Sequence, residues 1–164
     1  MASSLKNLSD YNQNTLPKAD DMKIGIVVSE WNTEITDALA EGAYQSLIEN
    51  GVKEDNIIIK KVPGSFELVL GAQLMLENAE VDSVICLGCV IQGETRHFDF
   101  ICDAVANGIM KLNTVYNCPV IFGVLTTNTQ EQAKDRSGGK HGNKGIEAAI
   151  TAIKMVGLVN ELEK

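Results

Sequence analysis

Residues 88–100, Gly-Cys-Val-Ile-Gln-Gly-Glu-Thr-Arg-His-Phe-Asp-Phe, lead from an apolar strand pattern through a glycine-flanked turn into a helix. In open α/β sheets, ligands bind where the carboxyl end of a strand meets the amino end of a helix. The amide N–H groups exposed at such a helix start favour anions. His97, one of only two histidines in the chain, falls at this turn and can exchange protons near neutral pH. The stretch therefore predicts a strand–helix unit of an α/β sheet with a ligand site at its turn.

Apolar strand patterns and helical patterns alternate on both sides of this unit. Strands spaced roughly 30 residues apart and joined by helices indicate a parallel sheet covered on both faces. We therefore expect an α/β protein, a flavodoxin-like three-layer α/β/α sandwich with a central four-stranded parallel sheet, as a single domain over residues 22–164. The predicted strands cover residues 23–28, 57–62, 83–87 (continuing toward Val90) and 120–125, and the predicted helices cover about 35–47, 66–78, 97–116 and 145–161.

A further helix is predicted after the last strand. A capping box, either Asn128 with Glu131 or Thr129 with Gln132, opens this helix, which ends at residues 137–139. The glycine-rich stretch 138–145 lacks the spacing of a nucleotide-binding phosphate loop. We interpret it as a loop between helices and assign no role to His141.

The acidic charge of the chain limits its partners. With 14 Lys and Arg against 22 Asp and Glu, the net charge is −8, so we expect no nucleic acid partner, because phosphate backbones need clustered cations. A small phosphorylated substrate needs only one well-placed cation and some amides. No apolar run approaches the roughly 20 residues of a membrane span. We expect a cytoplasmic protein with no membrane partner, in which polar residues 1–21 form a flexible or partner-paired N-terminal arm.

The four cysteines raise the question of metal or redox chemistry. Cys86 and Cys89 have the C-x-x-C spacing found in zinc and redox motifs, but no second C-x-x-C or C-x-x-H completes a zinc set. Both lie near the end of a predicted strand, where residues three apart point to opposite faces. We therefore expect Cys86, Cys89, Cys102 and Cys118 to be reduced, mostly buried thiols and expect no metal site.

An apolar seam runs along the predicted 97–116 helix. Its members recur in alternating steps of three and four residues, as in helices that pack side by side. The seam either faces the core of its own chain or joins helices from several copies around an axis. The residues are Phe98, Ile101, Val105, Gly108, Leu112 and Val115.

Candidate site residues follow the carboxyl ends of the predicted strands, so several loops converge on one edge of the sheet. Trp31, the only tryptophan, either offers a stacking surface for a planar heteroaromatic ligand or plugs the core. Glu67 opens a helix, where its carboxylate either complements the helix dipole or accepts hydrogen bonds from ligand hydroxyl or ring N–H groups.

The turn before the 97–116 helix predicts proton transfer and anion binding. The positive end of the helix dipole opposes protonation of the His97 imidazole, which can then act as a base; a structural role is the alternative. Gly93 permits close approach, and the amides of Glu94 and Thr95 can hold an oxyanion. Arg136 is either a solvated surface side chain or a forked cation that faces this turn and completes a phosphate clamp.

Five segments, in order along the chain, carry a resemblance to a known family. They are Trp31-Asn32, Val-Pro-Gly-Ser-Phe-Glu at 62–67, the signature at 88–99, Pro-Val-Ile-Phe-Gly-Val-Leu-Thr-Thr at 119–127, and residues 136–145. Together they resemble the 6,7-dimethyl-8-ribityllumazine synthase family, and the likeness covers nearly everything from residue 23 to the C-terminus.

The resemblance implies a transferase of riboflavin biosynthesis. Enzymes of this family catalyse the penultimate step of that pathway. They condense 5-amino-6-(D-ribitylamino)uracil with (2S)-2-hydroxy-3-oxobutyl phosphate to give 6,7-dimethyl-8-ribityllumazine, phosphate and water. The family relation further implies that His97 is the catalytic residue and transfers protons, with no cofactor and no metal. By the same resemblance the phosphate is held by Glu94, Thr95 and Arg136, and the pyrimidine with its ribityl chain by Trp31, Ser65, Phe66, Glu67, Cys89, Val90, Ile91 and, from a neighbouring subunit, Phe122.

The resemblance also implies self-association. Family members are pentamers, and some assemble twelve pentamers into an icosahedral shell of sixty subunits; the short 138–145 loop favours the shell. Riboflavin synthase is the expected pathway partner. Two alternatives remain: a non-catalytic lumazine- or flavin-binding or shell-forming protein of the same fold, and a flavodoxin-type electron carrier. The second is disfavoured because the phosphate turn follows the third strand rather than the first.

Overall fold

Four parallel strands form the centre of the protein. The computed structural model describes residues 15–163, and its main sheet has the order β2-β1-β3-β4. The strands are β1 (Ile24–Ser29), β2 (Ile57–Val62), β3 (Ser83–Ile91) and β4 (Val120–Thr127). The chain moves from β1 outward to β2 and then crosses to β3 on the other side of β1. A topological switch point therefore lies between β1 and β3, where open α/β sheets bind ligands.

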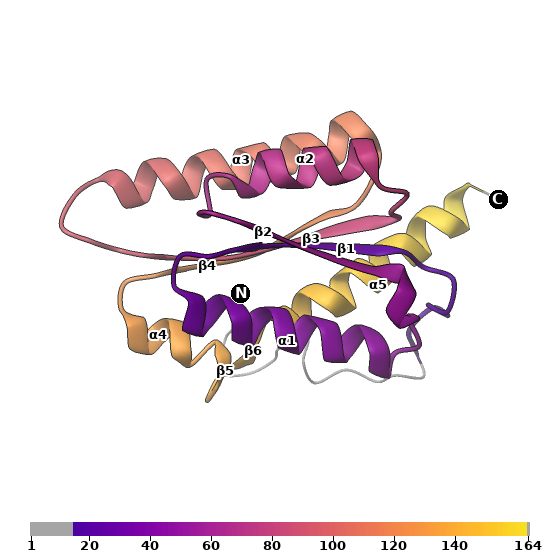
Figure 1. The fold of residues 1–164 in the computed structure, drawn as a ribbon, viewed down its shortest axis with the longest axis horizontal. Helices are drawn as coiled ribbons and strands as arrows, with labels where there is room; N and C mark the ends of the chain where they lie inside the picture. The colour runs from indigo at the N-terminus through magenta and orange to yellow at the C-terminus, as the bar shows by residue number, and fades with distance from the viewer. Residues whose placement is uncertain (1–14, 164) are drawn as a thin grey trace.

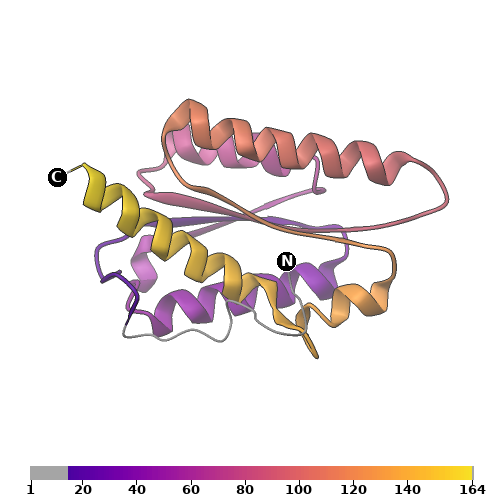
Figure 2. The same cartoon turned by 180° about the vertical axis from the view of Figure 1, so that it is seen from behind.

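Helices cover both faces of this sheet, as predicted. In Figure 1 α2 (Leu68–Asn78) and α3 (His97–Tyr116) lie on one face, and α1 (Thr33–Glu49) lies on the other. Seen from behind in Figure 2, α5 (Lys144–Leu162) crosses the same face as α1, with the short α4 (Gln130–Lys134) beside it. The three-layer α/β/α sandwich and the four-stranded parallel sheet are thus confirmed.

The two faces of the sheet bury separate cores. The core on the α1 and α5 side includes Ile24, Ile26 and Cys89, whereas the core on the α2 and α3 side includes Val27 and Cys86. This alternation follows from the strand period of two. It confirms that Cys86 and Cys89 point to opposite faces, and all four cysteines are free thiols.

The predicted 97–116 helix has the expected bounds, since α3 runs from His97 to Tyr116. Val105 and Leu112 of its seam are buried in the chain's own core, together with Ile109. A Cβ atom on Gly108 would lie 2.6 Å from Val69 Cγ2, so α2 packs closely against this part of the helix. The middle of the seam therefore faces the core of the same chain.

The segment after β4 differs from the prediction. Of the two capping alternatives, Thr129 is the N-cap, since its Oγ1 accepts from Gln132 N at 3.2 Å. The return bond differs from a capping box, because Gln132 Oε1 accepts from Asn128 N at 2.9 Å and not from the N–H of Thr129 itself. The helix ends at Lys134, earlier than expected. The supposed loop at 138–145 contributes to a hairpin of β5 (Ser137–Gly139) and β6 (Gly142–Asn143). Glycine-rich strands this short have no apolar alternation, which explains why the sequence did not reveal them. A single 3₁₀ turn, η2 (Glu54–Asn56), also precedes β2.

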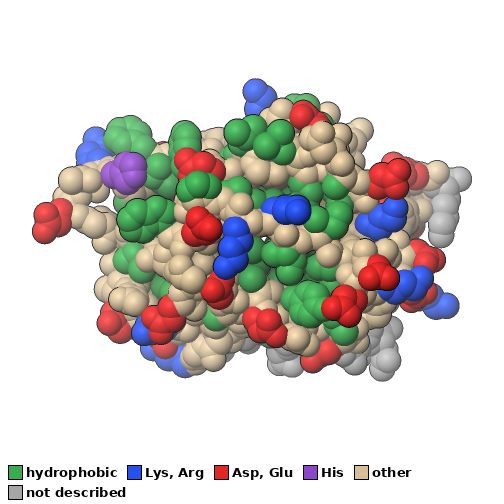
Figure 3. All heavy atoms as spheres, viewed as in Figure 1, with side chains coloured by type: hydrophobic (Ala, Val, Ile, Leu, Met, Phe, Trp, Pro, Cys, Tyr) green, Lys and Arg blue, Asp and Glu red, His purple; other side chains and the backbone are tan. Residues whose placement is uncertain are grey.

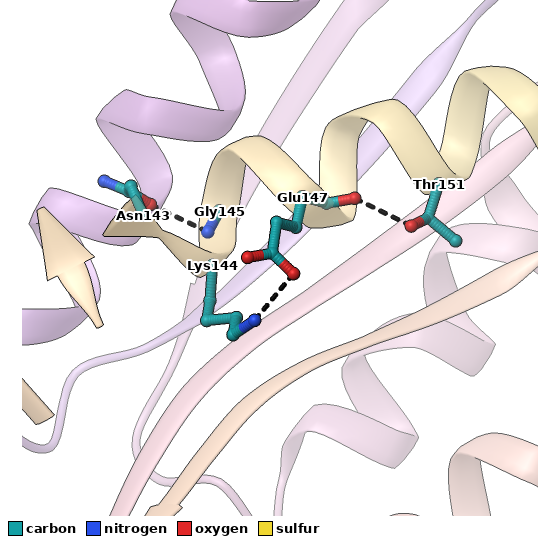
Figure 4. A network of polar contacts seen from close by, with 5 residues as sticks. All are labelled: Asn143, Lys144, Gly145, Glu147 and Thr151. Atoms are coloured by element: carbon teal, nitrogen blue, oxygen red, sulfur yellow. Dashed lines mark hydrogen bonds and ion pairs between the residues drawn. The ribbon is translucent and has the colours of Figure 1, made fainter. Parts of the chain in front are cut away.

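The start of α5 is fixed by a small polar network (Figure 4). Asn143 Oδ1 caps the helix by accepting from Gly145 N at 2.7 Å, and Asn143 Nδ2 donates to the Ala38 carbonyl of α1 at 2.9 Å. Lys144 Nζ pairs with Glu147 Oε2 at 2.6 Å, and Thr151 Oγ1 donates to the Glu147 carbonyl at 2.7 Å. The network ties the start of α5 to α1 and so holds one outer layer together.

Most of the predicted N-terminal arm lies outside the described residues. Of residues 15–21, Ala19 is buried and Leu16 is partly buried against the core on the α1 and α5 side. Among the described residues, no helix has the length and apolar character needed to cross a membrane.

Candidate functional site

A pocket of about 650 Å³ opens at the carboxyl edge of the sheet, where the switch point predicts it. Loops after β1 and β2, the end of β3 and the start of α3 form its walls. Its lining residues are Trp31, Asn32, Gly64, Ser65, Phe66, Glu67, Cys89, Val90, Ile91, His97 and Ile101. The structure thus brings together eight of the sequence candidates: Trp31, Ser65, Phe66, Glu67, Cys89, Val90, Ile91 and His97.

An aromatic ring and a carboxylate flank one side of the pocket. Trp31 is 73% exposed and lines the pocket, so it does not plug the core. A Cβ atom on Gly64 would lie 3.4 Å from Trp31 Cδ1 and 3.0 Å from Glu67 Oε2. Gly64 therefore lies between the indole and the carboxylate, which places a stacking surface beside a hydrogen-bond acceptor.

Ser65 contributes a buried hydroxyl to the floor of the pocket. The buried hydroxyls of Ser29 and Ser65 have no hydrogen-bond partner within the described part of the chain. A Cβ atom on Gly88 would lie 2.7 Å from Ser65 Oγ and 3.4 Å from Ser29 Oγ. Glycine at 88 therefore leaves room for two hydroxyls under the pocket, and Ser65 also contributes to its lining.

The end of β3 supplies the opposite wall. Cys89, Val90 and Ile91 lie past the last β1–β3 pair, Val28 with Leu87, and are paired with β4 alone. Burial raises the pKa of the Cys89 thiol to about 11, so this cysteine is a neutral side chain and not a nucleophile at neutral pH.

The turn before α3 places His97 at the rim. His97 is the first residue of α3, and its backbone N–H donates weakly to Thr95 Oγ1 at 3.4 Å. Arg96 turns along the helix, with its Nε 3.5 Å from Asp99 Oδ2 and its guanidinium carbon 5.8 Å from the centre of the Phe100 ring. Glu94 and Thr95 are exposed beside the pocket and do not line it.

Two sequence candidates lie away from this pocket. Phe122 is in the middle of edge strand β4, opposite Cys86, and is 43% exposed. Arg136 follows α4 and donates from Nη1 to the Gln132 carbonyl at 2.9 Å. Neither residue lines the pocket of its own chain.

Sequence reasoning included Asn32 and Gly64 in its candidate segments without assigning them a role, and it did not place Ile101 at the site, although all three line the pocket. Asn32 and Gly64 belong to the Trp-Asn and Pro-Gly pairs that follow β1 and β2, so their position after a strand end was the available signal. Ile101 was assigned to the helical seam, and it reaches the pocket because it lies one turn beyond His97. Within residues 15–163 no group of three or more His, Cys, Asp or Glu side chains has the arrangement of a metal site.

The fold and the pocket define an α/β protein with a pocket at the switch point of its sheet, lined by an indole ring, a carboxylate and a histidine. The sequence model of the family described as 6,7-dimethyl-8-ribityllumazine synthase matches residues 21–160, and the chain belongs to that family.

Individual relatives agree over nearly their full lengths. The chain is 56% identical over 156 residues to the 6,7-dimethyl-8-ribityllumazine synthase of Parabacteroides distasonis, covering 95% of this chain and 98% of that protein. It is 60% identical over 156 residues to the synthase of Cytophaga hutchinsonii, with the same coverage. It is 51% identical over 164 residues to the synthase of Phocaeicola vulgatus, covering all of this chain and 98% of that protein.

Proposed function

We propose that the protein is a transferase that condenses 5-amino-6-(D-ribitylamino)uracil with (2S)-2-hydroxy-3-oxobutyl phosphate, the penultimate step of riboflavin biosynthesis. Relatives that are 51% to 60% identical over nearly their full lengths have the name of this synthase. The observation that carries the proposal is the pocket itself, in which Trp31, Glu67 and His97 surround one cavity. A planar pyrimidine, a polyol chain and a proton-transfer step need these three kinds of group.

The pyrimidine is proposed to stack on Trp31. Glu67 and the polar floor at Ser65 accept hydrogen bonds from the ribityl hydroxyls and ring N–H groups, while Phe66, Cys89, Val90 and Ile91 enclose the ring. The amine of the uracil then attacks the ketone of the second substrate, and loss of one water gives an imine. Phosphate leaves by elimination, and the ring closes with loss of a second water. The steps need proton transfer and involve no net oxidation, so His97 is assigned to move protons.

The phosphate is proposed to bind at the start of α3. The amides near Glu94 and Thr95 and the Thr95 hydroxyl suit an anion at a helix start, and Arg136 is the proposed counter-charge. Arg136 does not line the pocket of its own chain. Its role as counter-charge therefore requires that an assembly of several chains brings Arg136 to a phosphate site. Holding two reactive substrates together supplies a large part of the acceleration.

Assembly is part of the same proposal. The protein is proposed to form pentamers, with closure into a sixty-subunit shell favoured by the short 138–145 segment. Exposed apolar side chains on α2 and α3, including Leu70, Leu74, Phe100 and Met110, support self-association. Figure 3 shows apolar side chains exposed on the upper layer, where α2 and α3 lie in Figure 1, and also across the middle of the same face. Riboflavin synthase is the proposed consumer of the product, and the four free thiols suit a cytoplasmic location.

The alternative, a non-catalytic lumazine- or flavin-binding or shell-forming protein, is not favoured. A carrier that only binds the ring needs Trp31 and Glu67 but has no need of His97 at the rim. The names of the relatives also describe an enzyme rather than a carrier.

The deciding experiment is turnover by the purified protein with both substrates and a chelator. Lumazine formation and phosphate release are followed against a protein-free control, because these substrates react slowly unaided. Saturable formation well above that control, with equal amounts of the two products, is expected. A protein that binds the uracil substrate or riboflavin but gives no excess over background contradicts the proposal and supports the carrier.

A further inference from the structure

Asn32 has an unusual backbone among the pocket residues. Its φ of 62° and ψ of 46° lie in the left-handed region, and within residues 15–163 only Asn117 is another non-glycine residue with positive φ. Asparagine tolerates this conformation better than most residues. The Asn32 carbonyl also accepts from Ile35 N at 2.8 Å and Thr36 N at 3.0 Å, so the turn leads directly from Trp31 into α1.

The side chain of Asn32 joins the loop after β1 to strand β3. Its Nδ2 donates to the Cys89 carbonyl of β3 at 2.9 Å. The β1–β3 pairing ends at Val28 with Leu87, so β3 has no β1 residue beside it at Cys89. The amide of Asn32 takes the place of a missing strand donor and ties the loop after β1 to the β3 wall of the pocket.

Trp31 has few other restraints. Its backbone N–H donates to the Pro63 carbonyl at 3.2 Å, and its ring is largely exposed. Few packing contacts therefore define the direction of the indole, and the flanking backbone must do so. That backbone is fixed on one side by the bond to Pro63 and on the other by the turn and amide of Asn32.

We propose that Asn32 is a positioning residue that holds Trp31 at the pocket, through its left-handed turn and its amide bond to the Cys89 carbonyl. The proposal deepens the proposed function, in which Trp31 stacks on the pyrimidine of the first substrate. Asn32 acts indirectly, by fixing the backbone that sets the direction of the Trp31 ring, and it has no assigned part in proton transfer.

Two variants remove the amide donor of Asn32 and leave the left-handed turn accessible. Asn32→Gly keeps the left-handed turn accessible and removes the amide. Asn32→Asp keeps the side-chain size but replaces the donor with a carboxylate, which cannot donate to the Cys89 carbonyl. Asn113→Asp is the matched control, because Asn113 Nδ2 donates to the Ile109 and Val120 carbonyls at 2.9 Å each, at the start of β4 and away from the pocket.

The single tryptophan gives a direct readout in the ligand-free protein. Time-resolved fluorescence anisotropy of Trp31 is expected to show faster indole motion in Asn32→Gly and Asn32→Asp. The KM for the uracil substrate is expected to rise about tenfold, as the loss of one buried hydrogen bond implies. The KM for the phosphorylated substrate and kcat are expected to change little. Asn113→Asp should lower the unfolding midpoint and leave the anisotropy and both KM values unchanged.

The outcomes distinguish this proposal from the proposed function. If Asn32→Gly has the same Trp31 anisotropy decay and the same KM for the uracil substrate as the wild type, the positioning role is overturned. This variant is sufficient for the test even if Asn32→Asp fails to fold. A wild-type protein without turnover would contradict the proposed function, while faster Trp31 motion in the variants would still support the role of Asn32. The same loss of Trp31 order in Asn113→Asp would also overturn the proposal, because it would reveal only general loosening.

Discussion

His97 is the residue that distinguishes the proposed enzyme from the alternative, a non-catalytic ligand carrier. It begins α3 and lines the pocket, so a ring nitrogen can reach a bound substrate. His97→Ala is expected to lower kcat by about 10²- to 10⁴-fold, the usual contribution of general acid–base catalysis. Riboflavin binding, measured by quenching of Trp31 fluorescence, should remain close to wild type. Unchanged turnover in His97→Ala would show that the assignment of His97 is wrong.

Gly88 is the residue that keeps the pocket floor open. A Cβ atom there would lie 2.7 Å from Ser65 Oγ and 2.9 Å from Leu68 Cδ1. Gly88→Ala is therefore expected to cost about 1–3 kcal/mol of unfolding free energy, as overpacking typically does, and to weaken binding of the uracil substrate. Urea unfolding and equilibrium binding measure the two effects.

The stability control for Gly88→Ala is Gly93→Ala, because no atom lies within 4 Å of a Cβ at position 93. Equal unfolding free energies for the two variants would contradict the close fit between Gly88 and Ser65. Adding Ser65→Ala to Gly88→Ala should recover part of the lost stability, since it removes the nearest atom.

At the scale of elements, the backbones of α1 and α5 pack closely against each other at Gly145. A Cβ atom on Gly145 would lie 1.9 Å from the Leu39 carbonyl oxygen. Neither backbone can move without disturbing its helix, so Gly145→Ala is expected to cost at least about 3 kcal/mol, the upper part of the range for overpacking. Urea unfolding followed by circular dichroism measures the loss.

Gly157→Ala is the control within α5. Its Cβ would lie 2.5 Å from Pro17 Cγ, a side chain of the N-terminal segment and not a helix backbone. We expect a smaller loss of stability there. A loss at Gly145 no larger than that at Gly157 would show that α1 and α5 adjust more freely than their contact indicates.

The helices and strands differ in how well the sequence predicts them. Long periodic segments were predicted well, because a stripe of apolar residues sets both the type and the extent of α3, and four apolar runs define the strands. The β5–β6 hairpin escaped prediction, since Ser137–Gly139 and Gly142–Asn143 contain no apolar side chain. Hairpin pairing there depends on tertiary contacts with α1, such as the bond from Asn143 Nδ2 to Ala38, which no local pattern encodes.

For the whole molecule, the candidate site divides into two groups. The residues after β1 and β2 meet the end of β3 and His97 in one pocket because parallel strands end at one edge of the sheet, a relation that sequence order alone predicts. Phe122 and Arg136 do not join them in the single chain. No reasoning from strand order places Phe122 at this edge, since it lies in the middle of β4. Its proposed role therefore depends on how copies of the chain pack.

Shared sites can be tested by mixing two inactive variants. If Phe122 of the partner subunit closes the pocket that contains His97, then His97→Ala and Phe122→Asp damage different halves of each site. Both pure variants should have little activity. Co-expressed in equal amounts, they should regain about one quarter of wild-type activity, because in a cyclic assembly each half is intact with even odds. The measurement is turnover per chain, with native mass spectrometry to establish that mixed assemblies form.

The pattern of recovery decides where the site lies. If mixed assemblies are no more active than the two pure variants, the proposal of a shared site is wrong. Either each site then takes both His97 and Phe122 from one chain, or Phe122 does not belong to the site. Full activity in pure Phe122→Asp would likewise exclude Phe122 from pocket closure. Recovery near the expected fraction would mean that a single chain cannot complete the site. The exposed aromatic on edge strand β4 and the apolar surface of α2 and α3 would then serve catalysis as well as assembly, since dissociation would separate Phe122 from the substrate that His97 acts on.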